Sequence, residues 1–218
     1  MSLENFEGNT FVAFVDISGF TKKVIKRVND AMSTLGYFYN VGYQLLGNYS
    51  QDISGIFVSD CAILYVHNKE LEKTIKIERL LEIVSKINKK CIDNDIMLTT
   101  NISYGYFKYE EKIELKNMQK SSFAGNAYLN AYIDSTKKMK VCYCRILGDD
   151  TSDILNFINQ KYITKVEKKY CYFWWQCNSN NEMSNYIDDY KKIEKKYKGD
   201  EKFKKICNLT KRYSNATE

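Results

Sequence analysis

One stretch decides how this 218-residue chain folds: Phe11-Val12-Ala13-Phe14-Val15-Asp16-Ile17-Ser18-Gly19-Phe20-Thr21. Its first five residues form an apolar run rich in β-forming side chains, which predicts a buried strand. Serine and glycine follow, and from Thr21 the apolar residues change to helical spacing. Asp16 therefore stands where a buried strand ends and a loop into a helix begins. A carboxylate at such a position is costly to desolvate unless a cation or hydrogen-bond donors compensate it.

A second carboxylate, Asp60, lies at a predicted hairpin tip. Ile53–Val58 and Cys61–Val66 are apolar runs separated only by Ser59-Asp60, the pattern of a tight hairpin in a sheet covered on both faces. If this hairpin pairs beside the first strand, Asp16 and Asp60 converge at one edge of the sheet. Hard oxygen ligands of this kind suit Mg²⁺ or Mn²⁺, and two such ions about 3.5–4 Å apart would clamp the attacking and leaving oxygens of a phosphoryl displacement.

The loop after the first strand predicts a phosphate site. Backbone N–H groups between that strand and the helix, together with the positive helix end, can cradle phosphates. Thr21 is the expected helix cap. The expected apolar stripe of the helix consists of Val24, Ile25, Val28, Met32, Leu35 and Phe38. Each feature alone is weak, because an Asp that ends a strand is as often a cap, but together they indicate a metal-bound triphosphate.

The remaining periodicities predict the order of the other elements. Helical spacing returns over residues 71–92 and 124–138, and strands are expected at 96–109 and 141–147. A second hairpin is expected from 163–166 and 170–175, and the strongly charged stretch from residue 182 is expected to be helical. We therefore predict one α+β domain over residues 1–180, with a charged helical C-terminal extension, residues 181–218, packed on or near it.

The composition excludes several classes of protein. No apolar run approaches the roughly 18 residues needed to span a bilayer, and no basic and apolar leader opens the sequence, so we expect no membrane insertion and a cytoplasmic location. The seven cysteines are an odd number without paired zinc-site spacing, which favours reduced thiols. The net charge of +6 comes largely from the lysine-rich stretch of residues 191–212 and does not require a nucleic-acid partner.

These residues resemble a known family. The stretch Phe11–Thr21 is similar to the first-strand motif of class III adenylyl and guanylyl cyclases, and Val58-Ser59-Asp60-Cys61-Ala62-Ile63 is similar to their second metal motif. Gly125-Asn126-Ala127-Tyr128-Leu129-Asn130-Ala131-Tyr132 resembles their dimer-interface helix. The likeness spans Phe11 to Leu147, with weaker support through Trp175.

The resemblance implies a ferredoxin-like sheet with flanking helices and a head-to-tail homodimer whose active sites are shared across the interface. It assigns two Mg²⁺ or Mn²⁺ ions per site to Asp16, Asp60 and the backbone carbonyl of Ile17. The implied phosphate-binding residues are Ser18, Gly19, Phe20 and Thr21, with Lys165, Lys168 and Lys169 of the late hairpin as further candidates. The implied pocket for the base and the interface contains Ser122, Gly125, Asn126 and Asn130.

Three positions depart from the purine cyclases. Leu129 and Ile133 stand where those enzymes place an Asn and a transition-state Arg, and Ser122 stands in place of their base-selecting Asp. No lysine occurs from Gln51 to Ser59. The form Gly125-x-Ala127-x-x-x-Ala131-Tyr132 is more similar to the bacterial pyrimidine cyclases of the Pycsar antiphage systems.

The leading hypothesis is therefore an enzyme that cyclises UTP or CTP to a cyclic nucleotide, which a separate effector protein would read. The first alternative is a degenerate cyclase-like module that binds a nucleotide or a protein without turnover. A nucleic-acid-binding domain is a third reading, supported only by the net charge and by the aromatic run Tyr170–Trp175.

Overall fold

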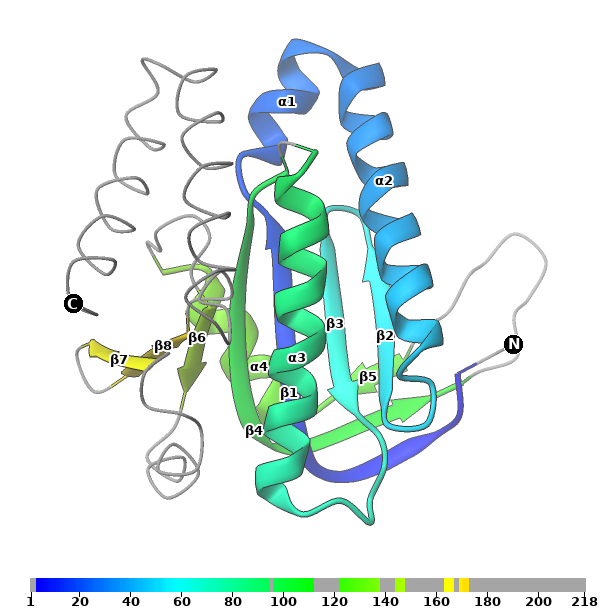
Figure 1. Ribbon diagram of the computed structural model, residues 1–218, viewed down its shortest axis with the longest axis vertical. Coiled ribbons are helices and arrows are strands. Elements are labelled where there is room, and N and C mark those ends of the chain that lie inside the picture. Colours follow the sequence, from blue (N-terminus) through cyan, green and yellow to red (C-terminus); the bar gives the residue numbers. More distant parts are fainter. Residues whose placement is uncertain are drawn as a thin grey trace, which may run out of the picture.

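The computed structural model describes residues 3–94, 96–111, 122–137, 144–147, 163–166 and 169–172. The described residues form strands and helices interspersed along the chain (Figure 1). Their bounds are β1 (Phe6–Ile17), α1 (Phe20–Lys26), α2 (Val28–Gly47), β2 (Ile53–Val58), β3 (Cys61–Val66), α3 (Lys73–Ile92), β4 (Leu98–Glu110), β5 (Ser122–Ala124), α4 (Asn126–Ser135), β6 (Cys144–Leu147), β7 (Ile163–Val166) and β8 (Lys169–Tyr172).

The sheet has the strand order β2-β3-β1-β4-β6-β8-β7, and β5 pairs with β4. β1 is antiparallel to both of its neighbours, β3 and β4, and β2 is antiparallel to β3. Two strand–helix–strand units thus interleave, as in the ferredoxin-like split arrangement. The predicted α+β class and ferredoxin-like sheet are confirmed.

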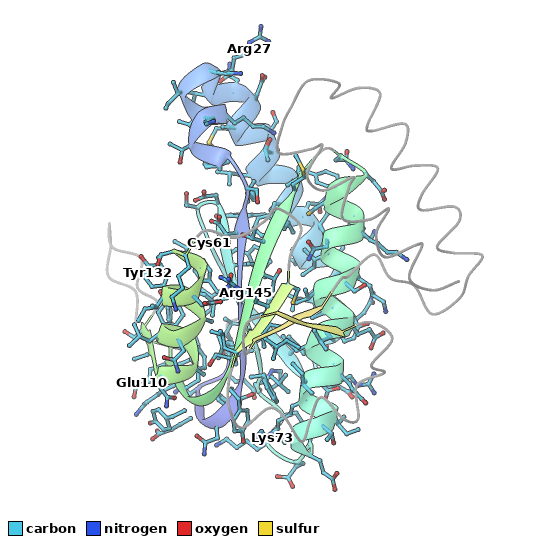
Figure 2. The ribbon with its side chains drawn as sticks, turned by 90° about the vertical axis from the view of Figure 1, so that its left-hand side faces the viewer. Arg27, Cys61, Lys73, Glu110, Tyr132 and Arg145 are labelled. Atoms are coloured by element: carbon cyan, nitrogen blue, oxygen red, sulfur yellow. The ribbon has the colours of Figure 1, made fainter. Side chains whose placement is uncertain are left out.

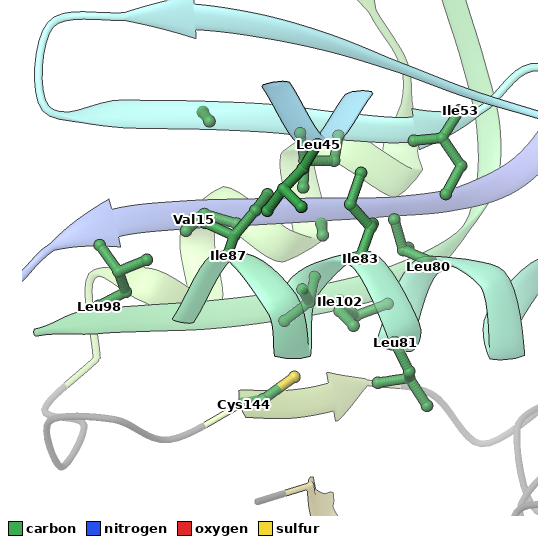
Figure 3. Close-up of a cluster of buried hydrophobic side chains, with 14 of the residues drawn as sticks. Val15, Leu45, Ile53, Leu80, Leu81, Ile83, Ile87, Leu98, Ile102 and Cys144 are labelled. Atoms are coloured by element: carbon green, nitrogen blue, oxygen red, sulfur yellow. The ribbon is translucent and has the colours of Figure 1, made fainter. Parts of the chain in front are cut away.

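Helices cover both faces of the sheet. α2 and α3 lie on one face and α4 on the other (Figure 1). Alternate residues of β1 point to opposite faces, so Phe11, Ala13 and Val15 pack under α2 and α3, as the core in Figure 3 shows for Val15. Val12 and Phe14 pack under α4. This alternation explains why the whole run is apolar.

The predicted helix after β1 is two helices. Arg27 has extended backbone angles, φ −156° and ψ 106°, which end α1 and start α2 in a new direction. The proposed stripe therefore does not form one buried face: Phe38 is buried, but Ile25 is 79% exposed and Val28 61% exposed. The expectation that Thr21 caps the helix was also wrong, because Gly19 occupies the N-cap, at φ 78°.

The other predicted elements agree with the structure where it describes them. The first hairpin has the predicted bounds, and α3, β4, α4 and β6 fall within a few residues of theirs. β5, which holds Ser122, was not predicted. The hairpin of β7 and β8 is confirmed, although residues 167–168 and 173–175 lie outside the described residues. The predicted C-terminal extension, residues 181–218, also lies outside them.

Within the described residues, no helix is both long enough and apolar enough to cross a bilayer.

Candidate active site

The sheet brings Asp16 and Asp60 together. In the β1–β3 ladder Asp16 lies directly opposite Cys61, and Asp60, the residue before Cys61, lies beside this pair in the hairpin turn. The Ile17 N–H donates to the Asp60 carbonyl oxygen over 2.9 Å, which closes the end of β1 onto this turn. The side-chain alternation that places Val12 and Phe14 on the α4 face also places Asp16 there. The predicted convergence of the two carboxylates is therefore what the strand register produces.

The turn that carries Asp60 is tight and strained. Val58 pairs with Cys61, so Ser59 and Asp60 are the two central residues of the hairpin loop. Ser59 has φ 52°, in the left-handed region that residues with a side chain seldom adopt. The Tyr39 hydroxyl of α2 donates to the Ser59 carbonyl oxygen over 3.0 Å. Helix α2 thus holds the turn from the outside.

Among the described residues, burial and a second acid, not a cation, set the electrostatics of Asp16. Burial, and then the negative charge of Asp60, raise the pKa of Asp16 to about 6. The same surroundings, with burial first and then Asp60 and Asp16, raise the pKa of the Cys61 thiol to about 11. Within the described part of the chain, neither Asp16 nor Asp60 forms an ion pair with Lys, Arg or His. A bound divalent cation would supply the missing positive charge.

The donor set suits a hard divalent cation. Two carboxylates and backbone carbonyls offer oxygen ligands, which Mg²⁺ and Mn²⁺ prefer. Asp16 and Asp60 are both only partly buried, so solvent could complete the coordination. The described residues contain no group of three or more His, Cys, Asp or Glu gathered as a metal cluster. The fit therefore rests on these two acids, with substrate phosphates or water as the remaining ligands.

The loop after Asp16 turns sharply into α1. Gly19 adopts a left-handed conformation that glycine tolerates without strain, and no side chain caps the helix there. The Ser18 N–H is occupied, because it donates to the Met97 carbonyl oxygen over 2.8 Å. The N–H groups of Gly19, Phe20 and Thr21 and the Ser18 hydroxyl are the loop donors that a phosphate could use.

α4 lies close to the end of β1 on the Asp16 face. The ring of Tyr132 meets Phe14 edge-on, with centroids 5.5 Å apart. Tyr132 and Cys61 appear on the same side of the molecule (Figure 2). Leu129 and Ile133, the two departures from the purine pattern on α4, are 50% and 46% exposed. With Tyr132, 43% exposed, they present an apolar surface.

A buried ion pair fixes α4 to the sheet. Asp134, 1% exposed, accepts a hydrogen bond from Asn101 of β4 over 2.7 Å and lies 2.8 Å from Nε of Arg145 on β6. Arg145 also donates to the backbone carbonyl of Asp134. Sequence reasoning missed Asp134 and Asn101, because nothing in the local pattern indicates a contact between residues 33 positions apart.

The remaining predicted site residues divide into two groups. Gly125 packs against the β4 backbone at the start of α4, and Ser122 begins β5, which pairs with β4. Asn126 and Asn130 are exposed on α4. Lys165 and Lys169 lie on β7 and β8, toward the sheet edge away from Asp60, and Lys168 lies outside the described residues. The structure therefore brings Asp16, Asp60, Ile17 and the 18–21 loop together but separates them from Lys165 and Lys169.

Solved structures share the fold of this chain. The adenylyl cyclase CyaB from P. aeruginosa superposes with a TM-score of 0.56 and 16% identity, over 83% of this chain and 99% of that chain. The guanylate cyclase domain of RhGC from Catenaria anguillulae, solved with GTP, gives a TM-score of 0.58 and 15% identity, over 78% and 98%. The chain has the fold of a class III nucleotidyl cyclase domain.

A third structure extends the comparison to a dimeric form. The guanylyl cyclase domain of the RhoGC fusion protein from the aquatic fungus Blastocladiella emersonii, in an atypical dimer, gives a TM-score of 0.57 and 16% identity, over 78% of this chain and 94% of that chain. No protein-family model and no curated protein sequence matches the chain. The chain therefore shares the class III cyclase fold, but sequence identities of 15–16% do not assign it an activity or a substrate.

Proposed function

We propose that the chain is a nucleotidyl cyclase that converts UTP or CTP to the 3′,5′-cyclic monophosphate and pyrophosphate. The observation that carries the proposal is that Asp16 and Asp60 converge in a sheet of the class III cyclase fold. Among the described residues, neither acid forms an ion pair with a basic side chain, and the pKa of Asp16 is raised. An acid pair kept at a desolvation cost indicates a ligand that compensates it.

Asp16 and Asp60, with the carbonyl of Ile17, would hold two Mg²⁺ or Mn²⁺ ions. When bound, such ions would lower the pKa of the ribose 3′ hydroxyl and offset the negative charge of the phosphates. The 3′ oxygen would form a bond to the α-phosphorus as the bond from the α-phosphorus to the bridging oxygen breaks, so that pyrophosphate leaves and the hydroxyl proton passes to water. Ser18 to Thr21 would orient the phosphates for this in-line attack.

The position of the late hairpin supports a site shared by two copies. β8 is the third strand from β1, and three strand spacings amount to about 14 Å. Lys165 and Lys169 are therefore better placed to meet phosphates held by a second copy than those held by their own Asp16. A head-to-tail homodimer would bring that about, with the exposed apolar residues of α4 in its interface.

The pyrimidine preference rests on what the α4 side offers a base. Ser122 replaces the acidic residue that the purine enzymes use, and Leu129 and Ile133 are apolar and exposed. The remaining polar candidates are Asn126 and Asn130, whose amides suit the carbonyl and amino edge of a pyrimidine. The likeness to the Pycsar cyclases adds a role in antiphage signalling in the cytoplasm, with a separate effector that reads the product.

A non-catalytic nucleotide-binding module is the second candidate. It is favoured by Leu129 and Ile133, which leave no polar group at the two positions that stabilise the transition state in the purine enzymes. Such a module would bind a triphosphate with metal but release it unchanged.

Product analysis separates these functions. Purified protein is incubated with each of the four ribonucleoside triphosphates and Mn²⁺, and the products are identified by mass spectrometry. Cyclic UMP or cyclic CMP is the expected product. Cyclic AMP or cyclic GMP would contradict the base assignment, and Mn²⁺-dependent binding of a triphosphate without any cyclic product would favour the non-catalytic module.

A further inference from the structure

The outward face of α2 carries an uncharged stripe. Val28, Met32, Tyr39 and Tyr43 recur at helical spacing and are 61%, 59%, 37% and 81% exposed. Gly36, also exposed, lies midway between them. These five residues are called the α2 stripe. A continuous line of exposed aromatic and aliphatic side chains on one helix marks a contact surface.

The charge distribution separates α2 from its neighbour. Over 20 residues α2 contains a single charged side chain, Asp30, whereas α3, of the same length and on the same face of the sheet, contains eight. Depletion of charge together with enrichment in tyrosine and methionine is the composition of an interface centre. α3 has the composition of a helix that faces solvent, and α2 does not.

We propose that the α2 stripe is a self-association surface that pairs with the α2 stripe of a second copy, antiparallel about a two-fold axis between Leu35 and Gly36. In such a pairing residue i of one copy faces residue j of the other, and j faces i, so the sum of the two numbers is constant. The stripe has this symmetry. A register centred between Leu35 and Gly36 places Val28 opposite Tyr43 and Met32 opposite Tyr39.

The charges at the two ends of α2 are complementary in this register. Lys22, Lys26 and Arg27 are exposed around the N-terminal end, where Arg27 projects from the tip of the molecule (Figure 2). The last turn of α2 carries no basic residue. Antiparallel pairing would bring the cations of each copy to the negative end of the other copy's helix dipole. Arg27 would lie opposite Gln44.

The glycine at the centre permits close approach. A Cβ added to Gly36 would meet no atom of its own chain within 4 Å, so the surface there is open. Packed helices lie about 8–10 Å apart, which leaves facing backbones roughly 4–5 Å apart where a glycine allows contact. A helix pair alone is smaller than a standard interface of about 800 Å² per partner, so we expect association that strengthens with protein concentration.

This surface is distinct from the shared-site dimer proposed above. α2 covers one face of the sheet and α4 the other, so pairing through α2 leaves the α4 side free. The two contacts together would form a larger assembly. Changes at Met32 and Tyr43, which do not contact the Asp60 turn as Tyr39 does, therefore report on self-association whether or not the chain is a cyclase.

Disulfide trapping tests the register. Gly36→Cys in the full chain places two thiols at the proposed axis, within the range of Cα separations of about 4.4–6.8 Å that a disulfide spans. Mild oxidation should give a covalent dimer on non-reducing gels. Ser33→Cys, exposed on the same helix but off the stripe, should stay at the background set by the wild-type thiols. Equal cross-linking of both variants, or none in Gly36→Cys, would overturn the pairing.

Molar mass by light scattering tests the association itself. The average molar mass of wild-type protein should rise with concentration. At the same concentration, the Met32→Glu and Tyr43→Glu variants should have at most half of the wild-type molar mass. Both side chains are largely exposed, so neither change threatens the fold. The control Ser33→Glu adds the same charge off the stripe and should behave like wild type. The proposal would be contradicted if the stripe variants had the same molar mass as wild type. It would also be contradicted if wild-type protein were monomeric and bound phosphatidylserine vesicles through the stripe.

Discussion

Asp16 is the residue on which the proposed site depends. Its effect on the free energy of unfolding can be measured. Its carboxyl has a pKa of about 6 in the folded chain against an ordinary value of 3.8, because of burial and then the charge of Asp60. A raised acid pKa means that protonation stabilises the folded state. This contribution is complete below the unfolded pKa and is lost as the pH rises through the folded one.

Asp16→Asn should therefore stabilise the metal-free protein at high pH. We expect a gain in unfolding free energy of about 2 kcal/mol near pH 8, allowing for partial exposure, and almost none near pH 4. Urea unfolding with EDTA at the two pH values measures it, with the exposed Asp30→Asn as control. If the asparagine variant is less stable than wild type at both pH values, Asp16 is not a desolvated acid held for a ligand.

At the scale of elements, the entry into α4 depends on Gly125. It has φ 146°, and an added Cβ would overlap the Tyr106 carbonyl oxygen. Gly125→Ala should lower the unfolding free energy by about 3 kcal/mol or lift α4 from β4. Gly47→Ala, whose Cβ would meet nothing, is the matched control and should match the stability of wild type or exceed it by up to about 1 kcal/mol. Equal stability of the two variants would mean that α4 does not pack against β4 as described.

The elements also show what a sequence can and cannot predict. The bounds of β2 and β3 followed from two apolar runs around two turn residues, because period and turn chemistry are local. The prediction of a single helix after β1 was wrong. The apolar residues keep helical spacing across Arg27, but the backbone of Arg27 is extended and interrupts the helix. Asp16 and Asp60 could be predicted as a pair from motifs, whereas the contacts of Asp134 with Asn101 and Arg145 depend on tertiary packing that no local pattern reports.

At the scale of the whole molecule, the sheet order predicts complementation between copies. Asp16 lies on β1 and Lys165 and Lys169 lie near the far edge, so a shared site takes its metal ligands and these lysines from different copies. Asp16→Ala and a charge-reversed Lys165, Lys168 and Lys169 variant should each be inactive alone. Mixed, they form heterodimers with one doubly damaged and one intact site, so cyclase activity should return.

The mixing experiment needs subunit exchange to be verified, for instance with two affinity tags. No activity in a verified heterodimer of two inactive parents would contradict the shared site. If the lysine variant is active on its own, these lysines do not bind the phosphates. The assignment of Asp16 and Asp60 as metal ligands would not be affected.

The central claim is that Asp16 and Asp60 hold the metal ions that cyclise a nucleoside triphosphate, and the most direct measurement is product formation by their conservative variants. Asp16→Asn and Asp60→Asn are assayed with UTP and CTP in Mn²⁺ beside wild type and Asp30→Asn. We predict cyclic nucleotide from wild type and the control, and a loss of about a thousandfold in each site variant, because metal stabilisation of the transition state is worth several kcal/mol. Undiminished cyclic product from either site variant, in protein that unfolds cooperatively like wild type, would contradict the account.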